Sequence, residues 1–179
     1  MFRKASDFHG YALHTPDGDI GHIEDFYFDD EEWRVRYVVV NTGGFLSQKR
    51  VLVSPLAFDG DSCEGRKIRV LLSREQIENS PAADLHQPLT RRWEREFHSY
   101  YDWPVYWALA PLGGVAAYPS VLHHAEEEGE AEELAQEKQL GLDEISGEDS
   151  HLQSMNDVCG FGVEASDGRI GHVGDFVLG

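Results

Sequence analysis

The sequence has little cysteine and few basic residues, and each shortage excludes a class of protein. Its two cysteines, Cys63 and Cys159, lie in different segments without the spacing of a metal site, which favours a reducing compartment over a disulfide scaffold. Lys and Arg number 15 against 33 Asp and Glu, which gives a net charge of −18. A surface this acidic repels phosphate backbones, so nucleic acid is not an expected partner.

Long apolar segments are also missing. No apolar run follows the first residues, as a secretory signal requires, and we interpret the protein as cytoplasmic. Residues 103–122 carry no charge, but Pro104, Pro111 and Pro119 interrupt them, and a bilayer cannot satisfy the backbone groups that proline frees. We therefore expect an aromatic strap over the protein's own domain and no membrane span, with peripheral or partner-covered association left open.

Catalytic and metal-binding motifs are scarce as well. No Ser-His-Asp spacing, Cys-His pair or glycine-rich phosphate loop stands out. The adjacent His123 and His124 point apart in an extended chain, and the acidic run at 29–32 is typical of a solvated turn. We expect no catalytic residue, no metal ligand and no cofactor, and interpret the protein as a non-enzyme.

β-structure is what the sequence has in quantity, above all between residues 17 and 53. Gly18 allows a tight turn, and residues 20–28 continue as a strand rich in large apolar side chains. Residues 33–40 alternate at first and then become apolar on both faces, as a strand entering a closed barrel does. Further short strands are predicted at 8–13, 50–53 and 67–72, with a loop at 59–62 between the last two.

One strand carries a break in its pattern. Ile20, Phe26 and Phe28 share one parity, which Ile23 does not. A β-bulge near Glu24 would restore the inward set, and bulges are how small barrels turn corners.

Two short helices are predicted after the strands. Ser73 and Gln76 have the spacing of a capping box that opens a helix to about Asn79. Thr90 is the expected cap of a second helix through about Tyr101. The aromatic face of this second helix is interpreted as packing on the barrel rather than as a ligand box, and it consists of Trp93, Phe97, Tyr100 and Tyr101.

The second half of the chain changes in composition. Residues 126–149 hold 11 acidic residues against one Lys, which predicts a solvated acidic linker. We expect a barrel domain with a helical extension at 1–107, a strap and linker at 108–150, and a further segment at 151–179.

That last segment repeats the first. Residues 157–176 placed over 7–26 give nine identities in twenty positions without a gap, including a shared Asp-Gly-x-Ile-Gly-His-x-x-Asp-Phe run. We interpret 151–179 as a truncated second copy, a β-hairpin that is disordered, docks on the first domain or pairs with another chain.

Five segments together carry a family resemblance: residues 17–26, Arg36-Tyr37-Val38-Val39-Val40, Val51-Leu52-Val53-Ser54-Pro55, residues 72–81 and Tyr100-Tyr101-x-Trp103-Pro104. With them the sequence resembles the PRC-barrel domain family over residues 1 to about 107, and over 151–179 as a partial second copy. The resemblance implies a mainly β protein built on a small, strongly bent β-barrel that serves protein contacts and has no catalytic residues.

The expected function is that of a non-enzymatic adaptor with a protein partner, including a second copy through the C-terminal hairpin or a barrel edge. The family also includes the cytoplasmic domain of the photosynthetic reaction-centre H subunit and the C-terminal barrel of a ribosome-maturation factor. The resemblance therefore leaves two alternatives: an H-subunit-like accessory protein in electron and proton transfer, and a ribosome- or RNA-associated barrel.

The candidate structural and interaction residues come from the repeat and from the aromatic segment. A His-carboxylate couple in each copy invites a proton-relay hypothesis, but a histidine bonded to a turn carbonyl is the favoured interpretation. The candidates are Gly18, Gly21, His22, Asp25, Phe26, Trp93, Tyr100, Tyr101, Trp103, Gly168, Gly171, His172, Asp175 and Phe176.

Overall fold

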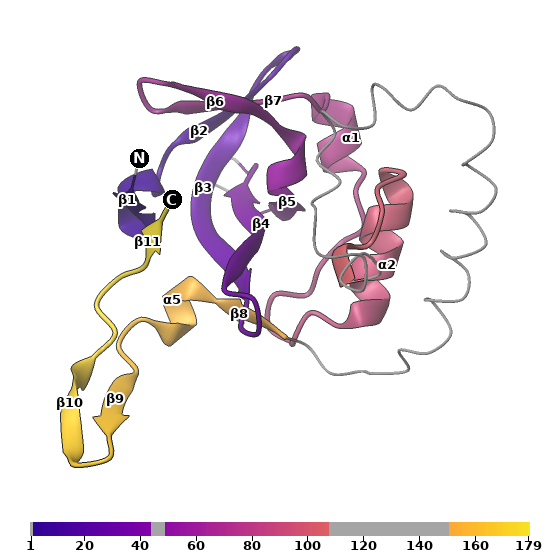
Figure 1. The fold of residues 1–179 in the computed structure, drawn as a ribbon. Coiled ribbons are helices and arrows are strands. Elements are labelled where there is room, and N and C mark those ends of the chain that lie inside the picture. The colour runs from indigo at the N-terminus through magenta and orange to yellow at the C-terminus, as the bar shows by residue number, and fades with distance from the viewer. Residues whose placement is uncertain (1, 44–48, 108–150) are drawn as a thin grey trace, which may run out of the picture. The chain divides into compact units, whose positions relative to one another are not determined.

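The computed structural model describes residues 2–43, 49–107 and 151–179 (Figure 1). By their contacts the residues divide into two compact units, 1–88 with 151–179, and 89–150. The acidic linker, the His123-His124 pair and most of the strap lie outside the described residues.

A seven-stranded sheet forms the first unit, in the order β5-β4-β3-β2-β7-β6 with β8 added to β3 (Figure 1). All its pairs are antiparallel except β2 with β7, a parallel pair that the sequence analysis did not foresee. The strands are β2 (Ala12–Thr15), β3 (Gly18–Asp29), β4 (Arg34–Asn41), β5 (Arg50–Val53), β6 (Phe58–Glu64), β7 (Lys67–Val70) and β8 (Leu152–Ser154).

The long strand β3 curves across the sheet (Figure 1) because it is bulged. Ile23 pairs with Val40 and Asp25 with Val39, so Glu24 is the extra residue. The side chains of Ile20, Ile23 and Phe26 are all buried as a result. The predicted bulge is confirmed.

The second half of β4 is buried on both faces, as its sequence predicted. Val38, Val39 and Val40 are successive residues and none of them is exposed. Arg34, at the start of the strand, lies in solvent.

The expected closure of the barrel is wrong: no pairing joins the outer strands β5 and β6 within the described residues. Ser54 caps the short 3-10 helix η2 (Pro55–Ala57), which directly follows β5. Pro55 has no N–H to donate, so the ladder stops at Val53 and η2 takes the place of a closing strand pair. The sheet is therefore bent and open.

Two predicted elements also need correction. The strand predicted at 8–13 is β2, which begins only at Ala12, because residues 5–8 form a 3-10 helix, η1 (Ala5–Phe8). The expected loop at 59–62 lies inside β6, where Gly60 adopts a positive φ of 51° and the register against β7 shifts. A bulged strand can hold turn-forming residues, which is why composition alone indicated a loop.

Both predicted helices are confirmed. α1 (Arg74–Glu78) opens with the full capping box: Gln76 N donates to Ser73 Oγ at 3.1 Å, and Ser73 N donates to Gln76 Oε1 at 2.8 Å. α2 (Arg91–Tyr100) begins where Trp93 N donates to Thr90 Oγ1 at 3.3 Å.

The C-terminal segment reproduces the opening of the chain element by element. η1, β2 and the start of β3 have counterparts 150 residues later. The later elements are α5 (Met155–Val158), β9 (Gly162–Ala165), β10 (Gly168–His172) and β11 (Val177–Leu178), while β1 (Arg3–Lys4) precedes η1.

Candidate interaction site between the two repeats

The two copies, called here repeat 1 (residues 3–28) and repeat 2 (residues 153–178), contact each other twice in the same way. In repeat 2, β8 pairs with the end of β3: Ser154 lies opposite Tyr27. In repeat 1, β1 pairs with β11: Lys4 lies opposite Val177. The two pairs are equivalent, because Lys4 and Ser154 are 150 residues apart and so are Tyr27 and Val177. Each repeat therefore pairs its leading strand, β1 or β8, with the other repeat, at β11 or at the end of β3.

Backbone hydrogen bonds close both contacts. Ala5 N donates to Phe176 O at 2.9 Å, and Asp30 N donates to His151 O at 2.9 Å. Bonds of this kind depend on strand position rather than on side-chain identity, so they tolerate the sequence differences between the repeats.

Asp25 and Asp175 occupy the same place in the two contacts. Asp25 Oδ2 accepts from Ser154 Oγ at 2.6 Å, and Asp25 Oδ1 accepts from Asn156 N at 3.1 Å. Asp175 Oδ2 accepts from Ser6 Oγ at 2.5 Å, and its Oδ1 accepts from Ser6 N at 3.3 Å. Ser6 and Asn156 are themselves equivalent positions.

Each carboxylate also binds its own strand. The amide of the following phenylalanine donates to Oδ1, at 2.7 Å for Phe26 and 2.8 Å for Phe176. This third bond fixes the side chain in the direction of the other repeat. The Asp-Phe dipeptide selected from the repeat is thus part of the contact in both copies.

The two carboxylates differ in electrostatics. Burial raises the pKa of Asp25, and the hydrogen bonds from Ser154, Phe26 and Asn156 only partly oppose that effect. The hydrogen bond from Ser6 holds the pKa of Asp175 below its ordinary value, because Asp175 is much less desolvated. Repeat 1 has a complete sheet around its aspartate, whereas repeat 2 has a two-stranded ribbon.

Apolar side chains fill the space beside the aspartates. The rings of Phe28 and Phe176 lie 5.1 Å apart, centroid to centroid. Phe28, Leu152 and Met155 are buried. Burial of aromatic and aliphatic groups is the main driving force of a contact of this size.

The glycines of the repeats have distinct tasks. Gly18 and Gly168, with φ of 118° and 138°, adopt the left-handed turn conformations that were expected of them. Gly21 instead lets β4 approach, because a Cβ there would lie 2.1 Å from the Asn41 carbonyl oxygen. A Cβ at the equivalent Gly171 would meet nothing within 4 Å.

The hypothesised histidine couples are not formed. Within the described residues neither His22 nor His172 makes a hydrogen bond to a carboxylate or to a turn carbonyl. Both interpretations of these histidines are therefore wrong. Their aspartates bind the other repeat instead.

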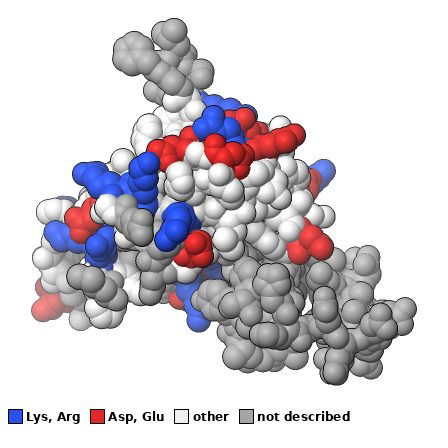
Figure 2. Space-filling model, turned by 90° about the horizontal axis from the view of Figure 1, so that it is seen from above, with Lys and Arg blue, Asp and Glu red and all other residues white. Residues whose placement is uncertain are grey.

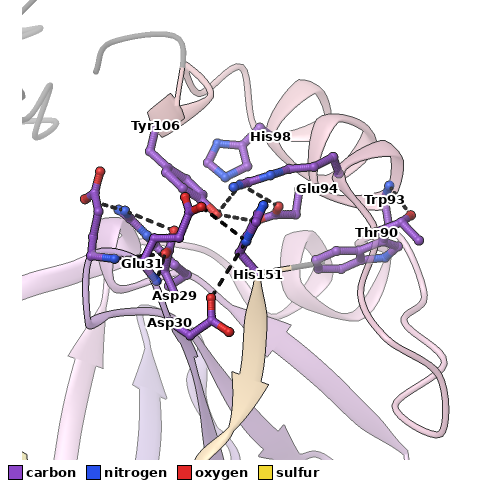
Figure 3. Close-up of polar contacts among 12 residues, drawn as sticks. Asp29, Asp30, Glu31, Thr90, Trp93, Glu94, His98, Tyr106 and His151 are labelled. Carbon is purple, nitrogen blue, oxygen red and sulfur yellow. Dashed lines mark hydrogen bonds and ion pairs between the residues drawn. The ribbon is translucent and has the colours of Figure 1, made fainter. Parts of the chain in front are cut away.

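The acidic turn after β3 is not simply solvated. Asp29 is only 2 % exposed, and its Oδ1 accepts from Glu31 N at 3.0 Å and Glu32 N at 3.1 Å. His151 lies between Asp30 and Glu31, with its Nδ1 at 3.8 and 3.5 Å from their carboxylates (Figure 3). The turn therefore holds the start of β8 against the end of β3.

The aromatic candidates belong to the second unit. The ring centroids of Tyr101 and Trp103 lie 4.6 Å apart in a stacked pair, those of Trp93 and Phe97 lie 5.0 Å apart, and Tyr100 is exposed. The expected packing of this face on the barrel stays a prediction, since the stripe is described only within its own unit.

A buried polar cluster accompanies the stripe. Arg91 Nη1 donates to Glu94 Oε2 at 3.0 Å and to Tyr106 Oη at 2.5 Å, while Tyr106 Oη donates to Glu94 Oε1 at 2.9 Å. Glu94 and Tyr106 point toward one another in Figure 3. The guanidinium of Arg91 also lies 4.4 Å from the centroid of the Trp107 ring.

Sequence reasoning missed Ser6, Ser154 and Asn156. They precede the part of the repeat with identical residues, so the alignment gave no signal there. Their one available signal is chemical, because small polar residues often stand at the start of short helices.

The charged surface is mixed on the face that Figure 2 presents, where acidic and basic side chains lie next to one another. Eleven of the 33 acidic residues lie in 126–149, outside the described part of the chain. Among the described residues, no three His, Cys, Asp or Glu side chains gather as a metal site would require, and no helix there is both long and apolar enough to cross a membrane.

Comparison with known protein families identifies one domain in the chain. Residues 2–76 match the PRC-barrel domain family, so the chain contains a PRC-barrel domain over those residues, and strands β2 to β7 lie within it. The resemblance expected from the sequence is thereby confirmed. No curated protein matches the chain.

Proposed function

We propose that this protein is a non-enzymatic interaction module of the PRC-barrel type, an adaptor whose repeats are built to dock on a second PRC-type surface. The observation that supports the proposal is the reciprocal contact, in which the same strand pair and the same aspartate are used in both directions. A contact that forms twice in one chain can also form with a similar surface on another protein.

The chemistry of the contact fits that role. Strand pairing supplies affinity through main-chain hydrogen bonds, and a carboxylate bound to backbone N–H groups fixes the register. Within the described residues, β5 and β6 leave further strand edges available for a partner.

The test is affinity capture with the tagged full chain as bait in a lysate of the source cell. The matched control is the same chain carrying Asp25→Ala and Asp175→Ala, which removes the paired carboxylates. We expect a protein retained in fixed stoichiometry by the wild-type chain, resistant to nuclease and moderate salt, and much reduced with the control.

The identity of the retained protein distinguishes the H-subunit-like role from the ribosome- or RNA-associated role. A photosynthetic reaction centre would specify the H-subunit-like role. Retention that nuclease abolishes, or that falls steeply with salt, would instead support the RNA-associated alternative and contradict an adaptor for proteins.

A further inference from the structure

The β9–β10 ribbon of repeat 2 exposes a large apolar side chain whose counterpart in repeat 1 is buried. Ile170, in β10, is 69 % exposed, against 6 % for Ile20. Phe161, directly before β9, is also exposed, at 59 %. Large apolar groups exposed at one short ribbon indicate a surface that another element covers.

Repeat 1 shows which element does the covering. There β3 continues past His22 and pairs with β4 in an antiparallel ladder from Asn41 back to Arg34. In repeat 2 the equivalent strand, β10, stops at His172, and its only partner in the described residues is β9. Among the residues that the structure describes, the backbone groups on the outer edge of β10 therefore have no ladder partner.

Gly171 leaves room for a strand to pair with the outer edge of β10. Its twin Gly21 lies so close to the Asn41 carbonyl that no side chain fits, whereas Gly171 has open space around it. The two ribbons share the same bulge, since Leu13 pairs with Gly21 and Val163 with Gly171, each beside a register shift. The open space at Gly171 thus has the position that a β4-like strand fills in repeat 1.

We propose that the outer edge of β10 binds an extended segment of a partner protein that resembles β4: antiparallel to β10, rich in β-branched residues, and with its backbone packed against Gly171. The inference deepens the proposed function and rests on it, because it names the chemistry of one partner. Main-chain pairing gives the affinity, and the space at Gly171 gives the register.

A second copy of this chain is not the occupant. Its own β4 is paired on both edges, with β3 on one side and β5 on the other, and its core residues are buried. The partner must offer such a strand with a free edge. A charged anchor is not required of it, because Gly174 replaces Glu24, the residue that binds Asn41 and Arg50 in repeat 1.

The probe is a fluorescein-labelled peptide with the sequence of residues 32–41, titrated against the unlabelled full chain and followed by fluorescence anisotropy. A scrambled peptide of the same composition is the control for non-specific binding. Amide chemical shifts of the isotope-labelled full chain locate the peptide, and we expect the changes at residues 169–173.

Two matched variants test the role of Gly171. Gly171→Ala puts a methyl group where the strand must approach, so we expect peptide affinity to fall at least about tenfold. Gly168→Ala is the control, because its φ is also positive and its surroundings are equally open, but a Cβ at its twin Gly18 would meet nothing within 4 Å. We expect it to bind the peptide within about twofold of wild type.

The inference would be overturned if the native and scrambled peptides bound equally, or if Gly171→Ala bound the peptide as tightly as wild type. It would also be overturned if the wild-type chain self-associated and Gly171→Ala made it monomeric, because the occupant would then be a second copy. Amide shifts of repeat 1 that stay unchanged in both variants show that each is folded. A negative peptide result is distinct from failure of the adaptor role. Affinity capture from the lysate detects a partner at any surface of the chain, whereas the peptide tests only the outer edge of β10.

Discussion

Asp25 joins the two repeats through two hydrogen bonds from repeat 2 and one from its own strand. Its position in a repeated Asp-Phe dipeptide was visible in the sequence, but its task was not. The donors lie 129 and 131 residues away, and a contact at that separation depends on how the whole segment docks. Local pattern therefore identified the residue and assigned it the wrong neighbour, His22.

Asp25→Ala should loosen the docking of repeat 2. The substitution leaves Ser154 Oγ and the Asn156 N–H without their acceptor, which typically costs about 1–3 kcal/mol. Amide hydrogen exchange at Asn156 should accelerate accordingly. Asp175→Ala should instead accelerate exchange at Ser6, and unchanged protection of Asn156 in Asp25→Ala would contradict the assignment.

The pH dependence of Asp25 has a definite sign. Because burial raises the pKa of Asp25 in the folded protein, the folded state holds the proton more tightly than the unfolded state. The stabilisation from Asp25 is fully present at pH values below its ordinary pKa of 3.8, and it is lost as the pH rises through the raised pKa of the folded state. Asp25→Asn removes the titration, so the free energy of unfolding of wild type minus that of Asp25→Asn should fall as pH rises through that window. A difference that rises with pH, measured by urea denaturation, would refute this.

At the scale of elements, the curvature of β3 follows from its sequence. The parity break at Ile23 predicted the bulge, and the capping residues Ser73 and Thr90 predicted both helix starts. These features were predictable because each depends on neighbours within a few residues. The open edge between β5 and β6 was not, since η2 replaces the closing pair only once the sheet is assembled.

Gly21→Ala should destabilise the β3–β4 ladder. Its Cβ would lie 2.1 Å from the Asn41 carbonyl oxygen, and backbone must shift to make room, which typically costs about 1–3 kcal/mol. Gly174→Ala is the matched control, because a Cβ there meets nothing within 4 Å and its φ is not in the left-handed region. Urea denaturation should show a lower midpoint for Gly21→Ala alone, and equal midpoints would count against the packing described.

In the helical unit, the buried hydrogen bonds of Tyr106 and the exposed Arg92–Glu96 ion pair should contribute differently to stability. Tyr106→Phe removes the hydroxyl that bonds both Arg91 and Glu94, at an expected cost of about 1–2 kcal/mol. Arg92→Ala removes an exposed pair with Glu96 and should cost less than about 0.5 kcal/mol. Tryptophan fluorescence during unfolding measures both, since three of the four tryptophans lie at 93, 103 and 107. Equal effects of the two substitutions would contradict the buried cluster.

For the whole molecule, the sequence predicted a PRC-barrel and a second copy of its first hairpin, and the structure adds how the copies meet. The identities between residues 7–26 and 157–176 indicated that the two segments fold alike. They did not indicate that β1 and β8 are exchanged, because the exchanged residues share no identity. Backbone pairing of this kind leaves no signature in side chains.

The most direct test of the reciprocal contact is a set of nuclear Overhauser effects in the full chain. The account predicts cross-strand contacts between residues 3–4 and 177–178, and between 27–29 and 152–154, both in one sample. In a mixture of isotope-labelled and unlabelled chains at low concentration, these contacts should arise within single molecules. Absence of either set, or contacts found only between labelled and unlabelled chains, would contradict the account.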